Sequence, residues 1–158
     1  MCVTKQRRPL GEDRARSWDS ESGSDAAPRV LIESPDGAEA HAAWRLLQRH
    51  GYRAMWCPGP RRTPARECPL SRAGSCTLVE EADAVVSALD LRDEACARVV
   101  RDLDTGAGDK RVVVVAPVDQ VADLARELRS VCVVPGPLSA EVVLGALDAG
   151  PASAPSLS

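Results

Sequence analysis

Five short apolar segments alternate with amphipathic segments between residues 29 and 149, and this alternation restricts the fold more than any other feature of the chain. The apolar segments span residues 29–33, 52–57, 84–89, 111–116 and 131–134. Three of them are apolar nearly throughout, as strands covered by helices on both faces must be. Strands joined by helical crossovers pair in parallel through right-handed connections. The pattern therefore predicts an α/β domain, a three-layer α/β/α sandwich with a five-stranded parallel sheet of order 2-1-3-4-5.

The segments between the strands carry apolar residues at the helical spacing i, i+3, i+4, i+7, which predicts one buried stripe on each helix. The first stripe consists of Ala40, Ala43, Trp44 and Leu47; the second of Cys96, Val99, Val100 and Leu103; the third of Val121, Leu124, Ala125 and Leu128. A last helix is expected to begin after Ser139 as its N-cap, to bury Val143, Ala146 and Leu147, and to end at Gly150.

The two ends of the chain differ from this pattern. Residues 1–27 are polar, with Gly, Ser, Pro and charges of both signs, and residues 150–158 contain two prolines and no apolar stripe. Such segments bury too little apolar surface to offset an ordering cost of roughly 1–2 kcal/mol per residue. We therefore expect a disordered N-terminal arm at 1–27, one folded domain at 28–149 and a disordered tail at 150–158.

Charge and hydropathy restrict the location and the partners. The chain has no run of about eighteen apolar residues that could span a bilayer, and its first residues are charged where a secretory signal would be apolar. We expect a cytoplasmic protein with no membrane segment. A net charge of -3 argues against broad nucleic-acid binding, which needs an excess of Lys and Arg. A protein is the expected partner, and the oligomeric state stays open.

Three of the six cysteines lie in a Pro-rich connection where the second helix of such a domain would normally be. Cys57, Cys68 and Cys76 stand 11 and 8 residues apart. Thiolate ligation of a zinc ion or an Fe–S cluster could order such a loop, a thiol pair could act as a redox switch, or the thiols could be structural. No cofactor is certain from the spacing. His50 is a poor fourth ligand, because the end of the first helix lies at the opposite edge of the sheet from Cys57.

Other residues near this connection have simpler interpretations. Cys96 and Cys132 fall on apolar segments, where cysteine acts as a small buried hydrophobe, and Cys2 lies in the arm. Trp56 and Trp44 could form an aromatic contact surface, although Trp44 fits the buried stripe. The connection contains four arginines and only one glutamate, Glu67. This local excess of positive charge would suit an anion or an acidic partner. The arginines are Arg61, Arg62, Arg66 and Arg72.

Two segments resemble the response-regulator receiver (CheY-like) family, which has a flavodoxin-like fold. The first runs from Arg29-Val-Leu-Ile-Glu-Ser-Pro-Asp-Gly37 through a helix to His50-Gly-Tyr52. It is similar to the family's opening strand, acidic turn and Gly-Tyr entry to the second strand. The second, from Val133 to Glu141, is similar to the end of the fifth strand, where a lysine and a proline precede the last helix. The resemblance covers about residues 29–149.

The resemblance implies a phosphotransfer site that this chain only partly supplies. Receivers use an acidic pair that holds Mg²⁺, an acceptor Asp after the third strand, a hydroxyl after the fourth, and the lysine. Here the acidic rim would consist of Glu33 and Asp36, separated by Ser-Pro, and Asp90 is the one candidate phosphoacceptor. Ala116 stands at the hydroxyl position, and Pro135-Gly136 at the lysine position. Phosphorylation of Asp90 is therefore not expected.

These observations favour a pseudo-receiver, a protein-interaction or regulatory module that acts without aspartyl phosphorylation. The alternative is a metal- or redox-sensing protein that uses the loop of Cys57, Cys68 and Cys76. An enzyme is not expected, because the sequence has no Gly-rich phosphate loop, nucleophile elbow or HExxH motif. If the chain were catalytic, Cys57 would be the nucleophile to test.

Overall fold

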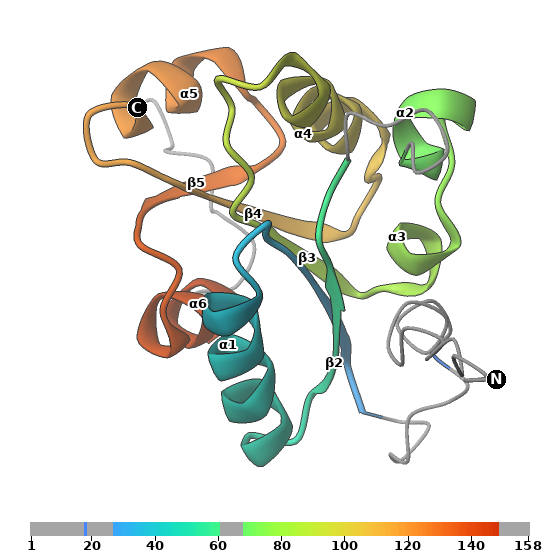
Figure 1. Ribbon diagram of the computed structural model, residues 1–158, viewed down its shortest axis with the longest axis vertical. Coiled ribbons are helices and arrows are strands. Elements are labelled where there is room, and N and C mark those ends of the chain that lie inside the picture. Colours follow the sequence, from blue (N-terminus) through green and yellow to red (C-terminus); the bar gives the residue numbers. More distant parts are fainter. Residues whose placement is uncertain (1–17, 19–26, 61–67, 149–158) are drawn as a thin grey trace, which may run out of the picture.

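The protein is a parallel five-stranded sheet with helices on both faces, and its strand order is β2-β1-β3-β4-β5 (Figure 1). The computed structural model describes residue 18 and residues 27–60 and 68–148. The strands are β1 (Arg29–Glu33), β2 (Arg53–Cys57), β3 (Ala84–Ser87), β4 (Arg111–Ala116) and β5 (Cys132–Pro135). The predicted fold class and strand order are confirmed, and the bounds of β1 and β4 match the predicted segments.

Six helices make the two outer layers of the described part of the chain. They are α1 (Gly37–Arg49), α2 (Pro69–Ala73), α3 (Thr77–Glu81), α4 (Glu94–Gly106), α5 (Val121–Glu127) and α6 (Ala140–Asp148). The helices α1 and α6 cover one face of the sheet, and α2 to α5 cover the other (Figure 1). Each face has its own apolar core, because alternate residues of every strand point to opposite sides.

The stripes predicted for the two longest helices hold. All four predicted residues of α4 are buried, as are Ala40, Ala43 and Leu47 of α1. Trp44 is half-buried against the same core, and its indole Nε1 donates a hydrogen bond to the Ala54 carbonyl at 2.8 Å. The predicted N-cap of α6 is confirmed by a hydrogen bond from the Val142 N–H to Ser139 Oγ at 3.2 Å.

The prediction of a buried stripe on the fifth helix was wrong. The helix α5 is seven residues long and buries none of its own residues. Leu128, just beyond its end, is buried. The helix packs against β5, an edge strand, and an edge strand offers a helix less apolar surface than a central strand does. The same edge strand leaves its own residues 132–134 half-buried.

The connection after β2 is more helical than the sequence suggested. The sequence predicted a Pro-rich connection in place of the second helix, whereas α2 and α3 are both present. Pro69 begins α2, where its missing N–H costs nothing, and Gly74 ends it with a left-handed φ of 71°. Cys68 and Cys76 directly precede α2 and α3. Two of the three cysteines are therefore fixed at helix starts.

Trp18 departs from the prediction of a disordered arm, because its side chain is completely buried. The remainder of the arm, with Cys2, lies outside the described residues apart from Ala27, as does the tail from residue 149. None of the helices in the described parts of the chain is both long and apolar enough to cross a membrane.

Candidate functional site

The carboxyl edge of the sheet brings the end of β1 between the ends of β2 and β3. In the parallel register, Glu33 pairs with Cys57 on one side and with Ser87 on the other. Glu33 has only 3% of its surface exposed, and Ser87 has none. Within the described part of the chain, Glu33 Oε2 and Ser87 Oγ have no hydrogen-bond partner at ordinary distance. The acidic residue expected on the rim is therefore in the interior.

Two loops at this edge are in contact with each other. Gly59 lies two residues after β2, and Leu89 lies two residues after β3. A Cβ atom on Gly59 would lie 2.5 Å from Leu89 Cδ2, so the backbone and this side chain are tightly packed. These loops follow the two strands that flank β1, which ends at Glu33. They are therefore packed together at the same edge of the sheet as Glu33.

Burial changes the ionisation of Glu33. Removal from water raises the pKa of its carboxyl from 4.5 to about 7, and the neighbouring Ser87 hydroxyl opposes part of this rise. A carboxyl with this pKa is protonated in about half of the molecules at neutral pH. Burial therefore makes ionisation of Glu33, the form that binds Mg²⁺, less favourable than that of an exposed carboxyl.

The other residues of the acidic turn have structural roles. Ser34 is buried, with its Oγ accepting a hydrogen bond from the Asp36 N–H at 3.2 Å. Asp36 is the N-cap of α1, and its Oδ1 accepts hydrogen bonds from the N–H groups of Ala38 and Glu39 at 2.9 and 3.2 Å. Trp56 Nε1 donates to the Ser34 carbonyl at 2.9 Å and its ring lies against Gly37, so it is partly buried in this turn. Glu33 and Asp36 therefore do not form a pair.

Asp90 lies away from the end of β3. The first residue after that strand is Ala88, whose N–H donates to the Glu33 carbonyl at 2.7 Å. Asp90 is exposed, and its Oδ1 accepts a hydrogen bond from the Arg92 N–H at 3.0 Å. It stabilises the turn before Asp93, which caps α4. The residue where the resemblance expects an acceptor is therefore an alanine.

The ends of β4 and β5 supply neither a hydroxyl nor an ammonium group. Ala116 ends β4 and is buried. Gly136 follows β5, donates its N–H to the Ala116 carbonyl at 2.7 Å, and precedes a cis peptide bond to Pro137. The sequence has two lysines, Lys5 and Lys110. Lys110 precedes β4, at the opposite edge, with its Nζ on the carbonyls of Glu80 and Ala82 at 2.6 Å.

The thiols gather around the same edge as Glu33. Burial raises the pKa of Cys57 to about 12, and the charges of Glu33 and of the other nearby thiols, Cys68 and Cys76, add to the effect. Burial likewise raises the pKa of Cys68, and that of Cys96 to about 11. These cysteines therefore lie near one another, with Cys57, Cys68 and Cys96 held as protonated thiols at neutral pH.

The described residues bear on two kinds of metal, the Mg²⁺ of receivers and the zinc or Fe–S cluster predicted for the cysteine loop. Among these residues, no three His, Cys, Asp or Glu side chains are grouped closely enough to hold a metal ion. At the positions where a receiver holds Mg²⁺, this chain has the buried Glu33, Ser34 and Ala88. This set does not suit a hard cation that needs charged oxygen ligands. Whether Cys57, Cys68 and Cys76 bind zinc or an Fe–S cluster stays a prediction.

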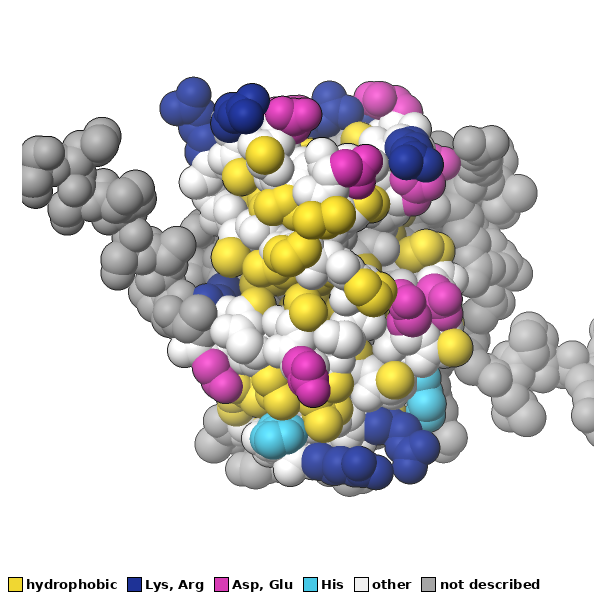
Figure 2. Space-filling model, turned by 90° about the vertical axis from the view of Figure 1, so that its left-hand side faces the viewer, with side chains coloured by type: hydrophobic (Ala, Val, Ile, Leu, Met, Phe, Trp, Pro, Cys, Tyr) yellow, Lys and Arg dark blue, Asp and Glu magenta, His cyan; other side chains and the backbone are white. Residues whose placement is uncertain are grey.

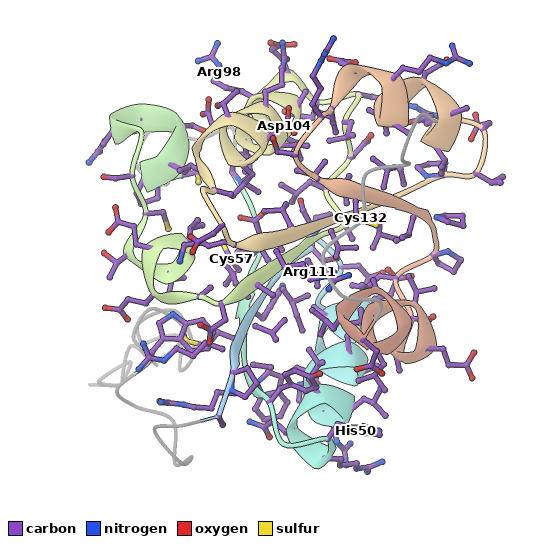
Figure 3. All side chains as sticks on the ribbon, turned by 180° about the vertical axis from the view of Figure 1, so that it is seen from behind. His50, Cys57, Arg98, Asp104, Arg111 and Cys132 are labelled. Carbon is purple, nitrogen blue, oxygen red and sulfur yellow. The ribbon has the colours of Figure 1, made fainter. Side chains whose placement is uncertain are left out.

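His50 and Cys132 are not part of this edge. His50 is the exposed C-cap residue of α1, and Figure 3 shows it far from Cys57. Cys132 begins β5 and is half-buried. Arg72 lies exposed in the last turn of α2. Arg61, Arg62 and Arg66 lie outside the described residues, so the arginine cluster stays a prediction.

Sequence reasoning missed four residues that shape the site. Ser87 and Ala88 could have been found from the parallel register, since the residues that end β1 and β3 must lie side by side. The contact between Gly59 and Leu89 has no signal in the sequence, because it joins two loops that are separate along the chain.

Comparisons with known proteins agree with the fold. No family model matches the sequence, and no curated protein matches it significantly. The chemotaxis response regulator CheY4 of Vibrio cholerae is similar in structure, with a TM-score of 0.55 at 13% identity, over 77% of this chain and 96% of that one. A CheY-like receiver domain from Methylobacillus flagellatus gives 0.53 at 20% identity, over 78% and 100%. A response regulator from Thermotoga maritima gives 0.51 at 15%, over 77% and 94%.

These similarities rest on structure and not on shared site residues. They cover the described domain and nearly the whole of each compared chain, with the strand order found here. The chain therefore has the fold of the CheY-like receiver domains of response regulators.

Proposed function

We propose that this protein is a pseudo-receiver, a regulatory module that binds other proteins and acts without aspartyl phosphorylation. The observation that carries the proposal is the buried carboxyl of Glu33, whose pKa of about 7 leaves it protonated in about half of the molecules at neutral pH. The same proposal places the protein in the cytoplasm, where thiols such as Cys57 and Cys68 stay reduced.

Phosphoryl transfer depends on positive charge around the transferred group. A metal ion bound by two carboxylates and an ammonium group would supply that charge in a receiver. Here one carboxyl is buried, Asp36 is engaged in capping α1, and Gly136 stands at the lysine position. An exposed Asp90, three residues beyond β3, would have to react without these groups.

The exposed surface supports a role in protein binding. Figure 2 shows hydrophobic side chains in a band across the face formed by α5, β5 and α6, with charged side chains above and below it. Val133, Val134 and Leu144 are only partly buried, and Val118 is 77% exposed. Apolar surface framed by charge is typical of sites where proteins associate.

A Mg²⁺ titration followed by backbone-amide NMR tests the proposal at the edge itself. We expect the amide signals of Glu33, Ser34 and Ala88 to stay unchanged up to millimolar Mg²⁺, with metal-depleted protein as the reference. A saturable shift confined to these three amides would contradict the proposal, because it would show that the edge binds the metal that receivers use.

The second candidate function is a metal or redox sensor. The proximity of the thiols favours its redox form, because no three possible ligands among the described residues are close enough together for a metal ion. Cys57, Cys68 and Cys76 are near enough for the charge of one to affect the pKa of another. The raised pKa values of Cys57 and Cys68 oppose reactivity, since the thiolate is the form that attacks or binds metal. Metal analysis and a UV-visible spectrum of anaerobically purified protein distinguish the pseudo-receiver from the sensor. The variant Cys68→Ser, purified in the same way, is the control. Stoichiometric zinc or iron that is lost in the variant would establish the sensor.

A further inference from the structure

Trp18 is buried although its neighbours in the sequence are polar. The side chain has no exposed surface and belongs to the apolar core under α2 to α5, together with Met55, Leu78 and Val79. Ser17 and Asp19 flank it, and the first strand begins eleven residues later, at Arg29. One indole therefore reaches the core from a segment that otherwise has the composition of a linker.

The indole of Trp18 packs at the C-terminal end of α3. That helix has only five residues and ends at Glu81. The Ala82 N–H, which would reach the Leu78 carbonyl in a longer helix, instead donates to the Val79 carbonyl at 3.3 Å. Trp18 Nε1 donates a hydrogen bond to the Leu78 carbonyl at 3.3 Å. The helix end thus offers both an apolar wall and an acceptor for an indole.

Two arginines, at the starts of β1 and β2, also contact Trp18. Arg53 is 6% exposed, and its Nη2 donates a hydrogen bond to the main-chain carbonyl of Trp18. The Arg29 guanidinium lies 6.0 Å from the centre of the indole ring, within range of a cation–π interaction. The backbone of Trp18, as well as its side chain, is therefore bound by polar groups, which is how a site holds a peptide.

We propose that the region between α3 and the starts of β1 and β2 is a binding site for a tryptophan-bearing peptide segment, and that the chain's own Trp18 occupies it. The inference is independent of the proposed function. The site recognises three features of its ligand: the indole ring by apolar packing and by Arg29, the indole N–H by Leu78, and the backbone carbonyl by Arg53. Release of Trp18 exposes the apolar wall of α3 and β2.

A peptide with the sequence of residues 14–22 tests this in the full-length chain. The variant Trp18→Ala removes the indole from the proposed site. Binding of the fluorescently labelled peptide is then measured by fluorescence anisotropy. We expect saturable binding to this variant, and about tenfold or more weaker binding to the wild-type chain, whose own Trp18 competes. A control peptide with alanine in place of the tryptophan should not bind. Adding Arg53→Met to the variant should weaken binding by about tenfold, because the peptide carbonyl loses its donor.

Two results would overturn the inference. The first is equal binding of the tryptophan and alanine peptides to Trp18→Ala, or equal binding of the tryptophan peptide to wild-type chain and variant. The second applies if Trp18→Ala does not fold on its own, and it is failure of the added peptide to restore a cooperative thermal transition to the variant. That failure would show that Trp18 is a core residue that no separate ligand replaces.

Discussion

Glu33 and Ser87 are paired in the parallel register at the carboxyl edge of β1 and β3, and both are buried. At the same edge, the loops after β2 and β3 are packed together through Gly59 and Leu89. This arrangement gives the edge the properties of an interior, where a neutral carboxyl is stable and a charged one is not.

The pKa of Glu33 makes folding stability depend on pH. Between the unfolded pKa of 4.5 and the folded pKa of about 7, the unfolded chain loses the proton while the folded chain keeps it. The stabilisation is therefore complete below pH 4.5 and is lost as the pH rises through 7, a change on the order of 3 kcal/mol at most. In denaturant unfolding, Glu33→Gln should remove this slope and the exposed control Glu127→Gln should keep it. Equal slopes in both variants would show that Glu33 ionises freely in the folded state.

Gly59→Ala tests whether the two loops at this edge are packed together. Gly59 has a left-handed φ of 79°, and the new methyl would also strike Leu89. Gly74 has a φ of 71° with open space around it, so Gly74→Ala introduces the backbone strain without the clash. We expect a loss of about 1–2 kcal/mol from strain at Gly74 and a further loss of about 1–3 kcal/mol at Gly59. Chemical denaturation measures both, and equal losses would mean that the loops are not packed together.

Asp36 should behave as a helix cap and not as a metal ligand. Asp36→Asn keeps an acceptor for the N–H groups of Ala38 and Glu39, whereas Asp36→Ala removes it. We expect the alanine variant to lose about 1 kcal/mol of stability and the asparagine variant to lose much less. Thermal unfolding with and without Mg²⁺ checks this. A Mg²⁺-dependent stabilisation of the wild-type chain that both variants lack would assign Asp36 to a metal site.

The thiols of Cys57 and Cys96 should react slowly in the folded protein. Their pKa values of about 12 and about 11 leave almost no thiolate at pH 8. Alkylation with iodoacetamide, mapped by peptide mass spectrometry, should label these two residues mainly after denaturation. Rapid labelling of Cys57 in the native state at neutral pH would instead support the redox-sensing function.

Secondary structure could be predicted where the residue pattern of a single segment was sufficient. The continuous valines of β4 and the stripe of α4 could be assigned because burial on both sides of a strand, or on one side of a helix, leaves a local pattern. The state of Glu33 could not be predicted, since its pKa depends on burial in the folded domain and on Ser87, which is distant in the sequence. Trp18 was missed for the same reason: its partners, Leu78 and Arg53, are distant in sequence, and its polar neighbours resemble a linker.

The most direct test of the central claim is intact-mass spectrometry after incubation with Mg²⁺ and acetyl phosphate, a small phosphodonor. A receiver domain with the complete set of site residues serves as the positive control, and Asp90→Asn as the matched variant. We predict an unchanged mass for the wild-type chain under conditions that phosphorylate the control. Gain of one phosphoryl group by the wild-type chain, absent from Asp90→Asn, would contradict the account and make Asp90 a working phosphoacceptor.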